Sequence, residues 1–318
     1  MSILVTGGAG FIGSHFIEYL LKRTEDSIVC IDNFNDYYDP ARKRENIVNF
    51  RDNSQVTVEE VDFAKSEELR PVFAKYEFQS IMHLGAYAGV RTSVETPGIY
   101  VRNNVEGTLN LLECARQTAI NRFVLVSSST VYGRGAQVPF REDSRLGIPA
   151  SPYGATKRAA ELLGRTYFEL HNTPVVCVRP FSVYGPRLRP DLALSIFAQR
   201  ILSGEEIPLF GDGSYRRDFT HVSDICDGLY AALTNTGLDG HAINLGHSEP
   251  IAMRKVIDMM EEALGAKAHI NSQPIRPEDL PITHASLERA KNLLDFHPKV
   301  AFAAGIVEFA QWYRKHFS

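Results

Sequence analysis

Short apolar runs alternate with longer amphipathic segments through the first half of the chain. Segments with helical periodicity lie near 12–23, 66–76, 98–119 and 152–172. Nearly continuous apolar runs between them predict parallel strands that are buried on both faces, namely Ile3–Val5, Ile28–Ile31, Val56–Val61, Ile81–Leu84, Phe123–Val126 and Val175–Val178. Because strands that alternate with helices form right-handed βαβ units, the pattern predicts an α/β fold with a doubly wound parallel sheet of the Rossmann type.

The pattern loosens after residue 180, where proline and glycine become frequent. Helices are expected near 191–203, 252–264, 286–294 and 303–316, and one more buried strand at Ala242–Leu245. We expect a dinucleotide-binding Rossmann domain over 1–180, to which 218–247 returns with one strand and one helix. Residues 181–217 and 248–318 are expected to form a smaller α/β substrate domain at the carboxyl edge of the sheet.

Composition narrows the class of protein but does not name a reaction. The 318 residues are enough for two domains, and 44% apolar with 23% charged residues is ordinary for a globular protein. A net charge of -4 argues against a nucleic-acid or anionic-membrane surface. No apolar run reaches about 20 residues, and no signal peptide is expected. The four cysteines are far apart, so we expect no metal site and a reducing, cytoplasmic location.

A glycine-rich turn follows the first predicted strand and opens a helix. Gly7, Gly10 and Gly13 have the spacing of a phosphate-binding turn, in which backbone amides approach a pyrophosphate without a Cβ in the way. Asp32 ends the second strand, where an acid would bind the ribose hydroxyls of NAD and repel the 2′-phosphate of NADP. Asp62 ends the third strand and is a candidate for contact with the adenine. The sequence therefore predicts an NAD site.

Three side chains that can move a proton follow the fifth predicted strand. Ser128 lies in a serine cluster at the strand end, and Tyr153 and Lys157 are four residues apart on one helix face. An ammonium at ~4 Å in an effective dielectric of ~20 would stabilise a phenolate by about 4 kcal/mol. This would lower the pKa of Tyr153 from about 10 to about 7. The sequence thus predicts a tyrosine base, with a serine that holds the substrate oxygen.

Together these residues resemble the extended short-chain dehydrogenase/reductase family, and within it the nucleotide-sugar 4-epimerases, over essentially the whole chain. The motifs that carry the resemblance are TGGAGFIGSH at 6–15, DN at 32–33, HLGAYA at 83–88, NNVEGTLNLLE at 103–113, SSSTVYG at 127–133, SPYGATK at 151–157, RPFSVYGP at 179–186 and RRDFTHVSDI at 216–225. The resemblance implies a homodimer built on helices 98–119 and 152–172. It also implies Ser128 as the catalytic hydroxyl, Thr130 as a second candidate, and NAD contacts from Phe11, Ile12, Asp32, Asn33, Asp62, Phe63, Leu84, Ala86, Ala88, Asn103, Tyr153 and Lys157.

The resemblance also implies a reaction. Tyr153 would take the proton from the sugar O4 while hydride passes from C4 to NAD, and the hydride would return to the other face of the 4-ketose. Related 4,6-dehydratases carry an Asp-Glu pair after the corresponding threonine, and related uronate decarboxylases carry a Glu nearby. This chain has Thr130-Val131-Tyr132 there, which favours epimerisation. A non-catalytic nucleotide sensor remains an alternative, although it would have little reason to keep the serine, tyrosine and lysine together.

Several segments resemble the UDP-glucuronate 4-epimerases in particular. DNFNDYYDP at 32–40 and AGVRTS at 88–93 match that group, and Arg189 matches its carboxylate-binding arginine, whose planar fork suits a carboxylate. Ser182 stands where UDP-galactose enzymes have asparagine, whereas Arg187-Leu188 replaces the expected Trp-Gly. A 4-epimerase of UDP-glucose or UDP-N-acetylglucosamine remains the alternative. The resemblance implies that Arg217 and Arg276 bind the diphosphate and that Phe210 lies near the uracil. The full set of implied UDP-sugar contacts is Arg91, Ser128, Thr130, Tyr153, Phe181, Ser182, Arg189, Phe210, Arg217 and Arg276.

Overall fold

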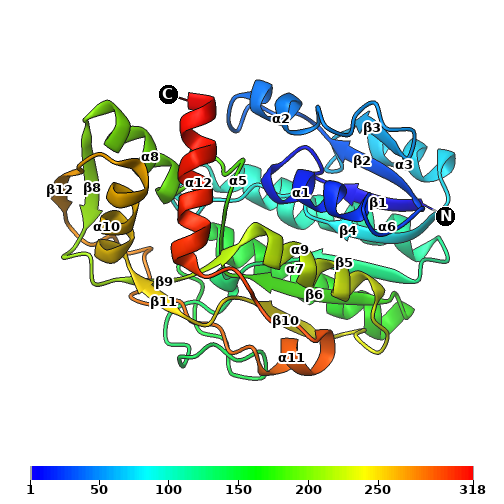
Figure 1. Ribbon diagram of the computed structural model, residues 1–318. Coiled ribbons are helices and arrows are strands. Elements are labelled where there is room, and N and C mark those ends of the chain that lie inside the picture. The colour runs from blue at the N-terminus through cyan, green and yellow to red at the C-terminus, as the bar shows by residue number, and fades with distance from the viewer. Residues whose placement is uncertain (1, 318) are drawn as a thin grey trace.

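The computed structural model describes residues 2–317, and its largest feature is a parallel seven-stranded sheet. The strand order is β10-β6-β5-β4-β1-β2-β3 (Figure 1). The strands are β1 (Ser2–Thr6), β2 (Ser27–Asp32), β3 (Val56–Glu60), β4 (Phe78–His83), β5 (Arg122–Val126), β6 (Val175–Pro180) and β10 (Ala242–Leu245). Each overlaps a predicted strand, although β4 begins three residues before the predicted Ile81 and ends at His83, and neighbouring strands run parallel. The predicted doubly wound parallel sheet is therefore confirmed.

Helices cover both faces of this sheet. Successive side chains of a strand point to opposite faces, so Ile3 and Val5 of β1 enter one apolar core and Leu4 enters the other. The first core is completed by α1 (Phe11–Leu20) and α9 (Val222–Thr234), and the second by α3 (Ser66–Lys75), α6 (Gly107–Arg116) and α7 (Pro152–His171). Because both faces are buried, the strands appear in the sequence as nearly continuous apolar runs.

The helix predicted over 98–119 is not one regular helix. It consists of α5 (Pro97–Tyr100), a π-helical segment (Val101–Glu106) and α6, which ends at residue 116. A π-helical turn changes which side chains face a neighbour, and here it buries Asn103 and Asn104. Periodicity cannot reveal such a break, because the residues on both sides of it remain helical.

A smaller α/β region lies beside the carboxyl edge of the large sheet (Figure 1). It holds a three-stranded sheet of β7 (Ser182–Tyr184), β9 (Arg216–His221) and β11 (Pro250–Ala252), and a parallel pair of β8 (Glu206–Phe210) and β12 (His269–Gln273). Its helices are α8 (Ala193–Ser203), α10 (Met253–Leu264) and α12 (Phe302–Phe317). The sequence analysis predicted the helices but none of these strands, which are short and carry no clear alternation.

The segment 218–247 begins in β9 of the smaller region, and from residue 222 onward it joins the large sheet. It contains β10, which pairs with β6, and α9, which packs against β5 and β6. A Cβ at Gly228 in α9 would come within 2.6 Å of Leu245, so glycine permits close packing of this helix on β10. Helix α11 (Glu288–Leu294) also packs against β10 and α9, although the sequence analysis assigned it to the smaller domain. The proposed domain boundaries remain a prediction.

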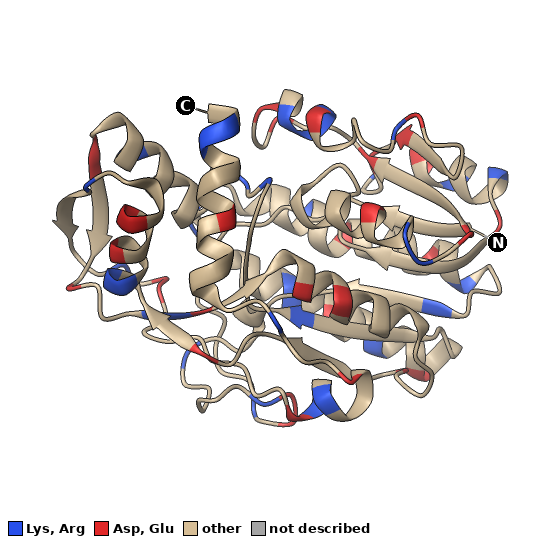
Figure 2. Ribbon diagram, in the orientation of Figure 1, with Lys and Arg blue, Asp and Glu red and all other residues tan. Residues whose placement is uncertain are grey.

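Two further short helices were not expected, α2 (Pro40–Asn46) and α4 (Val90–Glu95), nor was a 3-10 turn at Ser129–Val131. Residues of both charges are spread along the helices and loops of both parts of the molecule (Figure 2). Between residues 2 and 317, no helix combines the length and apolar character needed to cross a membrane.

Candidate active site

A cavity of about 380 Å³ lies at the carboxyl edge of the large sheet. The strand order reverses there between β1 and β4, the place where doubly wound sheets bind their ligands. Of the residues predicted to contact NAD, the cavity is lined by Gly7, Gly10, Phe11, Ile12, Gly13, Asp32, Asn33, Phe63, Leu84, Ala86, Ala88, Asn103, Tyr153 and Lys157. Segments far apart in the sequence thus meet in one place, as the resemblance implied.

Asp62, the predicted adenine contact, is not among the lining residues. Its Oδ2 accepts a hydrogen bond from Arg102 Nη2 at 2.9 Å, and its Oδ1 accepts one from the backbone N–H of Ala64 at 3.0 Å. These bonds tie the carboxylate to the loop after β3 and to the π-helical segment. The neighbouring Phe63 lines the cavity instead. A contact between Asp62 and adenine remains a prediction.

The glycine turn brings the start of α1 close to the loop after β4. Gly7 has φ +65°, and a Cβ on it would lie 2.7 Å from the Cα of Gly85. A Cβ on Gly13 would lie 2.7 Å from the Cα of Gly8 and even closer to the carbonyl oxygen of Gly7. The unpaired N–H groups and positive dipole end of α1 therefore border the cavity. This cradle fits the pyrophosphate of NAD.

The carboxylate of Asp32 is fixed at the end of β2. Its Oδ1 accepts a hydrogen bond from the N–H of Phe34 at 2.9 Å and lies 3.4 Å from Nζ of Lys43. The same ammonium donates to Oδ1 of Asn35 at 2.9 Å. Lys43, Asn35 and Asp32 all line the cavity, which suits recognition of ribose hydroxyls. The sequence analysis gave Lys43 no role, because only the fold returns α2 to this strand end.

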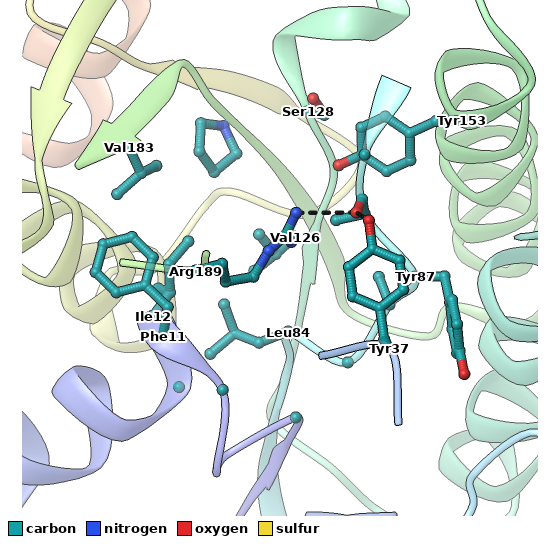
Figure 3. Close-up of a pocket in the computed structure, with 18 of the residues that line it drawn as sticks. Phe11, Ile12, Tyr37, Leu84, Tyr87, Val126, Ser128, Tyr153, Val183 and Arg189 are labelled. Carbon is teal, nitrogen blue, oxygen red and sulfur yellow. Dashed lines mark hydrogen bonds between the residues drawn. The ribbon is translucent and has the colours of Figure 1, made fainter. Parts of the chain in front are cut away.

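Ser128 and Tyr153 face the same space from the loop after β5 and from α7 (Figure 3). Thr130 donates to Oγ of Ser128 through its N–H at 3.2 Å and through its hydroxyl at 3.0 Å. Ser128 keeps its own proton for a further acceptor, and it lies close enough to Tyr153 to act against the rise in the pKa of that tyrosine. Thr130 and Ser128 thus form a pair of hydrogen-bonded hydroxyl groups in the cavity that Tyr153 also lines, an arrangement suited to proton transfer.

The pKa of Tyr153 departs from the sequence-based expectation. Burial raises it, although hydrogen bonding with Ser128 and the positive charge of Arg189 act in the opposite direction. Lys157 donates from Nζ to the carbonyl oxygen of Val126 at 2.8 Å, and burial lowers its pKa to about 8 against the opposing charge of Glu161. The expectation that Lys157 alone brings the tyrosine pKa to about 7 is therefore wrong for the protein without ligands. The ion-pair arithmetic omitted the cost of burying a phenolate.

Arg189 reaches the cavity from the loop after β7 (Figure 3), with its side chain 17% exposed. Nε donates to Oδ1 of Asp191 at 2.9 Å, and Nη2 donates to Oδ2 of Asp191 at 2.7 Å and to the carbonyl oxygen of Ala88 at 2.9 Å. Burial disfavours the charged guanidinium, but Asp191 and nearby tyrosines more than offset it and raise the pKa of Arg189. A permanent positive charge thus lies beside Ser128 and Tyr153.

A second cavity, of about 270 Å³, adjoins the first and shares Ser182 with it. Arg91, Phe210 and Arg217, all predicted substrate contacts, also line it. The guanidinium of Arg91 lies 4.5 Å from the ring centroid of Phe210, and that of Arg276 lies 4.3 Å from it. Arg276 is not among the lining residues. Two arginines at an aromatic ring, with Arg217 lining the same cavity, can bind a diphosphate beside a flat base.

Two more residues line these cavities: Asp279 lines the second, and Phe181, a predicted substrate contact, lines the first. Asp279 lies 3.8 Å from Nη2 of Arg91 and 3.7 Å from Nη2 of Arg217, a pairing that sequence reasoning missed. Phe181 also lines the first cavity, but it is only 2% exposed and packs near the rings of Tyr132 and Phe140. Phe181 therefore serves mainly the core, and a contact with the sugar remains a prediction.

The glycine turn, the acid at the end of β2 and the serine–tyrosine–lysine set together define a dinucleotide-dependent enzyme of the short-chain dehydrogenase/reductase type. A model of the NAD dependent epimerase/dehydratase family matches residues 3–246, and the chain belongs to this family.

Named relatives cover almost the full length of the chain. It is 37% identical over 314 residues to the UDP-glucuronate 4-epimerase of Thermodesulfobacterium geofontis, covering 98% of this chain and 96% of the relative. The UDP-glucuronic acid 4-epimerase from Bacillus cereus, solved with UDP-glucuronic acid and NAD, superposes with a TM-score of 0.93 at 34% identity over 100% of both chains. A dTDP-glucose 4,6-dehydratase from Streptomyces venezuelae reaches 0.92 at 28% identity, covering 99% of this chain and 98% of that one. Fold alone therefore does not choose the reaction.

Proposed function

We propose that this protein epimerises UDP-glucuronate at C4 to UDP-galacturonate, with NAD as a cofactor that stays bound. The observation that carries the proposal is the position of Arg189 in the same cavity as Ser128 and Tyr153. A side chain that can bind a carboxylate thus lines the same cavity as side chains that can transfer a proton. The names of the relatives at 37% and 34% identity support the same substrate.

In the proposed reaction, Tyr153 takes the proton from O4 of the sugar and later returns it. Ser128, whose Oγ is held by two hydrogen bonds from Thr130, binds O4 and lowers the cost of moving the proton. NAD, when bound, supplies the acceptor for the C4 hydride and gives it back. In this proposal the turn from Gly7 to Gly13 would hold its pyrophosphate and Asp32 its ribose, and Lys157 lines the same cavity as Tyr153.

The residues after Thr130 support epimerisation over water elimination. Val131 and Tyr132 are fully buried, and the hydroxyl of Tyr132 donates to Oδ1 of Asn244 at 2.7 Å. Neither side chain offers a carboxyl group to the cavity. This turn therefore provides no acid for protonating a leaving hydroxyl on the sugar.

The proposal divides the ligands between the two parts of the molecule. Residues 1–180 and 218–247 would hold NAD, and residues 181–217 and 248–318 would hold the nucleotide end of the substrate. The second cavity supports this division, because Arg217 and Phe210 come from β9 and β8 of the smaller part. We also propose a cytoplasmic location, since all four cysteines are free and three of them are buried.

A homodimer is proposed from apolar side chains on packed helices. Leu162 and Leu170 of α7 are 63% and 69% exposed, and Val101 is 52% exposed on the π-helical segment that packs against α7. A second copy of the chain would bury them. Light scattering is expected to show a dimer of twice 35.5 kDa, and Leu162→Glu should shift the population toward the monomer mass of 35.5 kDa. Val48→Glu, at a 51% exposed valine elsewhere, should leave the dimer unchanged; a monomeric wild type would refute the assignment.

Incubation with nucleotide sugars tests the proposed reaction. The purified protein, without added NAD, is incubated separately with UDP-glucuronate, UDP-glucose and UDP-N-acetylglucosamine, and the products are separated by chromatography. We expect UDP-glucuronate to equilibrate with UDP-galacturonate and the two neutral sugars to remain unchanged. Turnover of UDP-glucose alone would contradict the proposal that the substrate is a UDP-uronate. Bound NAD without turnover of any sugar would favour a nucleotide sensor.

A further inference from the structure

Arg189 is paired on one side before any substrate arrives. Asp191, two residues along the same loop, accepts from Nε and Nη2 at 2.9 and 2.7 Å, which occupies the side of the guanidinium that forms the best fork for a carboxylate. The second N–H of Nη2 donates to the carbonyl oxygen of Ala88 at 2.9 Å. These bonds use three of the five guanidinium donors, and the remaining two belong to Nη1.

The Arg189–Asp191 pair is anchored to the large sheet. The hydroxyl of Tyr37 donates to the carbonyl oxygen of Ala88 at 2.6 Å and lies 3.3 Å from Oδ2 of Asp191. The guanidinium of Arg189 also lies 5.4 Å from the centroid of the Tyr37 ring. Gly89 admits this ring closely, because a Cβ there would stand 2.5 Å from the tyrosine oxygen. Figure 3 shows Tyr37 and Arg189 side by side in the cavity.

We propose that Asp191 is a positioning residue for recognition of the uronate: it holds one side of the Arg189 guanidinium so that the Nη1 donors remain for the sugar carboxylate. This inference rests on the proposed function, because it needs a substrate with a carboxyl group. A buried guanidinium that lost its counter-ion would turn toward other acceptors or toward solvent. Asp191 therefore acts through Arg189 and does not need to touch the sugar.

The same positioning bears on a side reaction of the uronate. The 4-keto intermediate is a β-keto acid, and it loses carbon dioxide when the C5–C6 bond breaks and its electron pair enters the enolate of the ketone. The enolate then takes a proton from water at C5 to give the 4-keto pentose. That step requires the breaking bond to align with the carbonyl π system. A fixed Arg189 holds the carboxylate in one orientation, whereas a loosened Arg189 permits others. Removing the Asp191 charge should therefore raise the yield of the 4-keto pentose.

Asp191→Asn tests the positioning role with little change of shape. In the NAD-containing enzyme we expect the KM for UDP-glucuronate to rise roughly tenfold, since Arg189 loses the charged partner in a pair whose side chains are 17% and 29% exposed. The affinity for UDP-glucose and the NAD content should stay within about twofold of wild type, and the pentose fraction should rise. Asp191→Glu, which keeps the charge, should restore part of the KM. The control Asp258→Asn alters an exposed pair with Arg254 and should change nothing.

The outcomes separate this inference from the proposed function. If Asp191→Asn binds UDP-glucuronate as tightly as wild type or more tightly, the positioning role is wrong; tighter binding would mean that Asp191 competes with the substrate. A parallel loss of affinity for UDP-glucose would also overturn it, since a general distortion of the site would then explain the change. Arg189→Ala serves as the reference for the proposed function. If this variant keeps the uronate preference, the carboxylate site itself is misassigned.

Discussion

Tyr153→Phe should lower kcat for UDP-glucuronate by roughly a thousandfold, because general acid–base catalysis commonly contributes factors of about 100 to 10,000. The substitution removes the oxygen that accepts the O4 proton. It preserves the ring, which is 9% exposed and packs edge-on against Tyr100 at 6.2 Å between centroids. NAD content should therefore remain at the wild-type level. Rates are measured by product separation, and NAD is measured by absorbance after denaturation.

Tyr76→Phe provides a matched control for this variant. Tyr76 also donates a hydrogen bond, to Oε1 of Glu59 at 2.7 Å, but it is absent from the lining of both ligand cavities. We expect wild-type kcat for this control. If Tyr153→Phe keeps more than about a tenth of the activity, the proton must be taken by another group, and Ser128→Ala would then be the next variant to measure.

Gly13→Ala is expected to produce a protein that purifies with little NAD and has almost no epimerase activity. The added Cβ would meet the carbonyl oxygen of Gly7 and would lie 2.7 Å from the Cα of Gly8, so the phosphate-binding turn itself must move. Overpacking of this kind costs about 1–3 kcal/mol where side chains can adjust, and backbone atoms adjust less. Circular dichroism establishes whether the fold is retained, and titration with NAD gives its affinity.

Gly98→Ala is the corresponding control, because a Cβ at Gly98 would meet no described heavy atom within 4 Å. This variant should keep wild-type NAD content. Full NAD content in Gly13→Ala would show that the turn tolerates a methyl group, and the assignment of the glycine turn to the pyrophosphate would then have to be abandoned.

The sheet and the proton-transfer set could be predicted for the same physical reason. Strands buried on both faces must be apolar at nearly every position. The run at Phe123–Val126 can therefore be predicted as a strand without knowing which strands pair with it. Tyr153 and Lys157 are related by local helix geometry, and Ser128 by its place after a strand. Each of these signals is short-range in the sequence.

The residues that were missed act through long-range contacts or through side-chain orientation. Lys43 meets Asp32 only because α2 folds back over the end of β2. The pairing of Asp191 with Arg189 depends on which rotamers the loop after β7 allows, although the two residues are neighbours in the sequence. The raised pKa of Tyr153 depends on how deeply the ring is buried, which no local pattern contains. The position of the site could therefore be predicted from the sequence, but its charge pairs and pKa shifts could not.

The return of β10 to the large sheet has a consequence for dividing this protein into fragments. β6 is buried along its whole length and is flanked by β5 on one side and by β10 on the other. A fragment ending at residue 180 would leave β6 as a bare, apolar edge strand, which is a template for aggregation. The part of the molecule that would bind NAD can therefore complete its own sheet only after the ribosome has made the chain as far as Leu245, well past the end of β6.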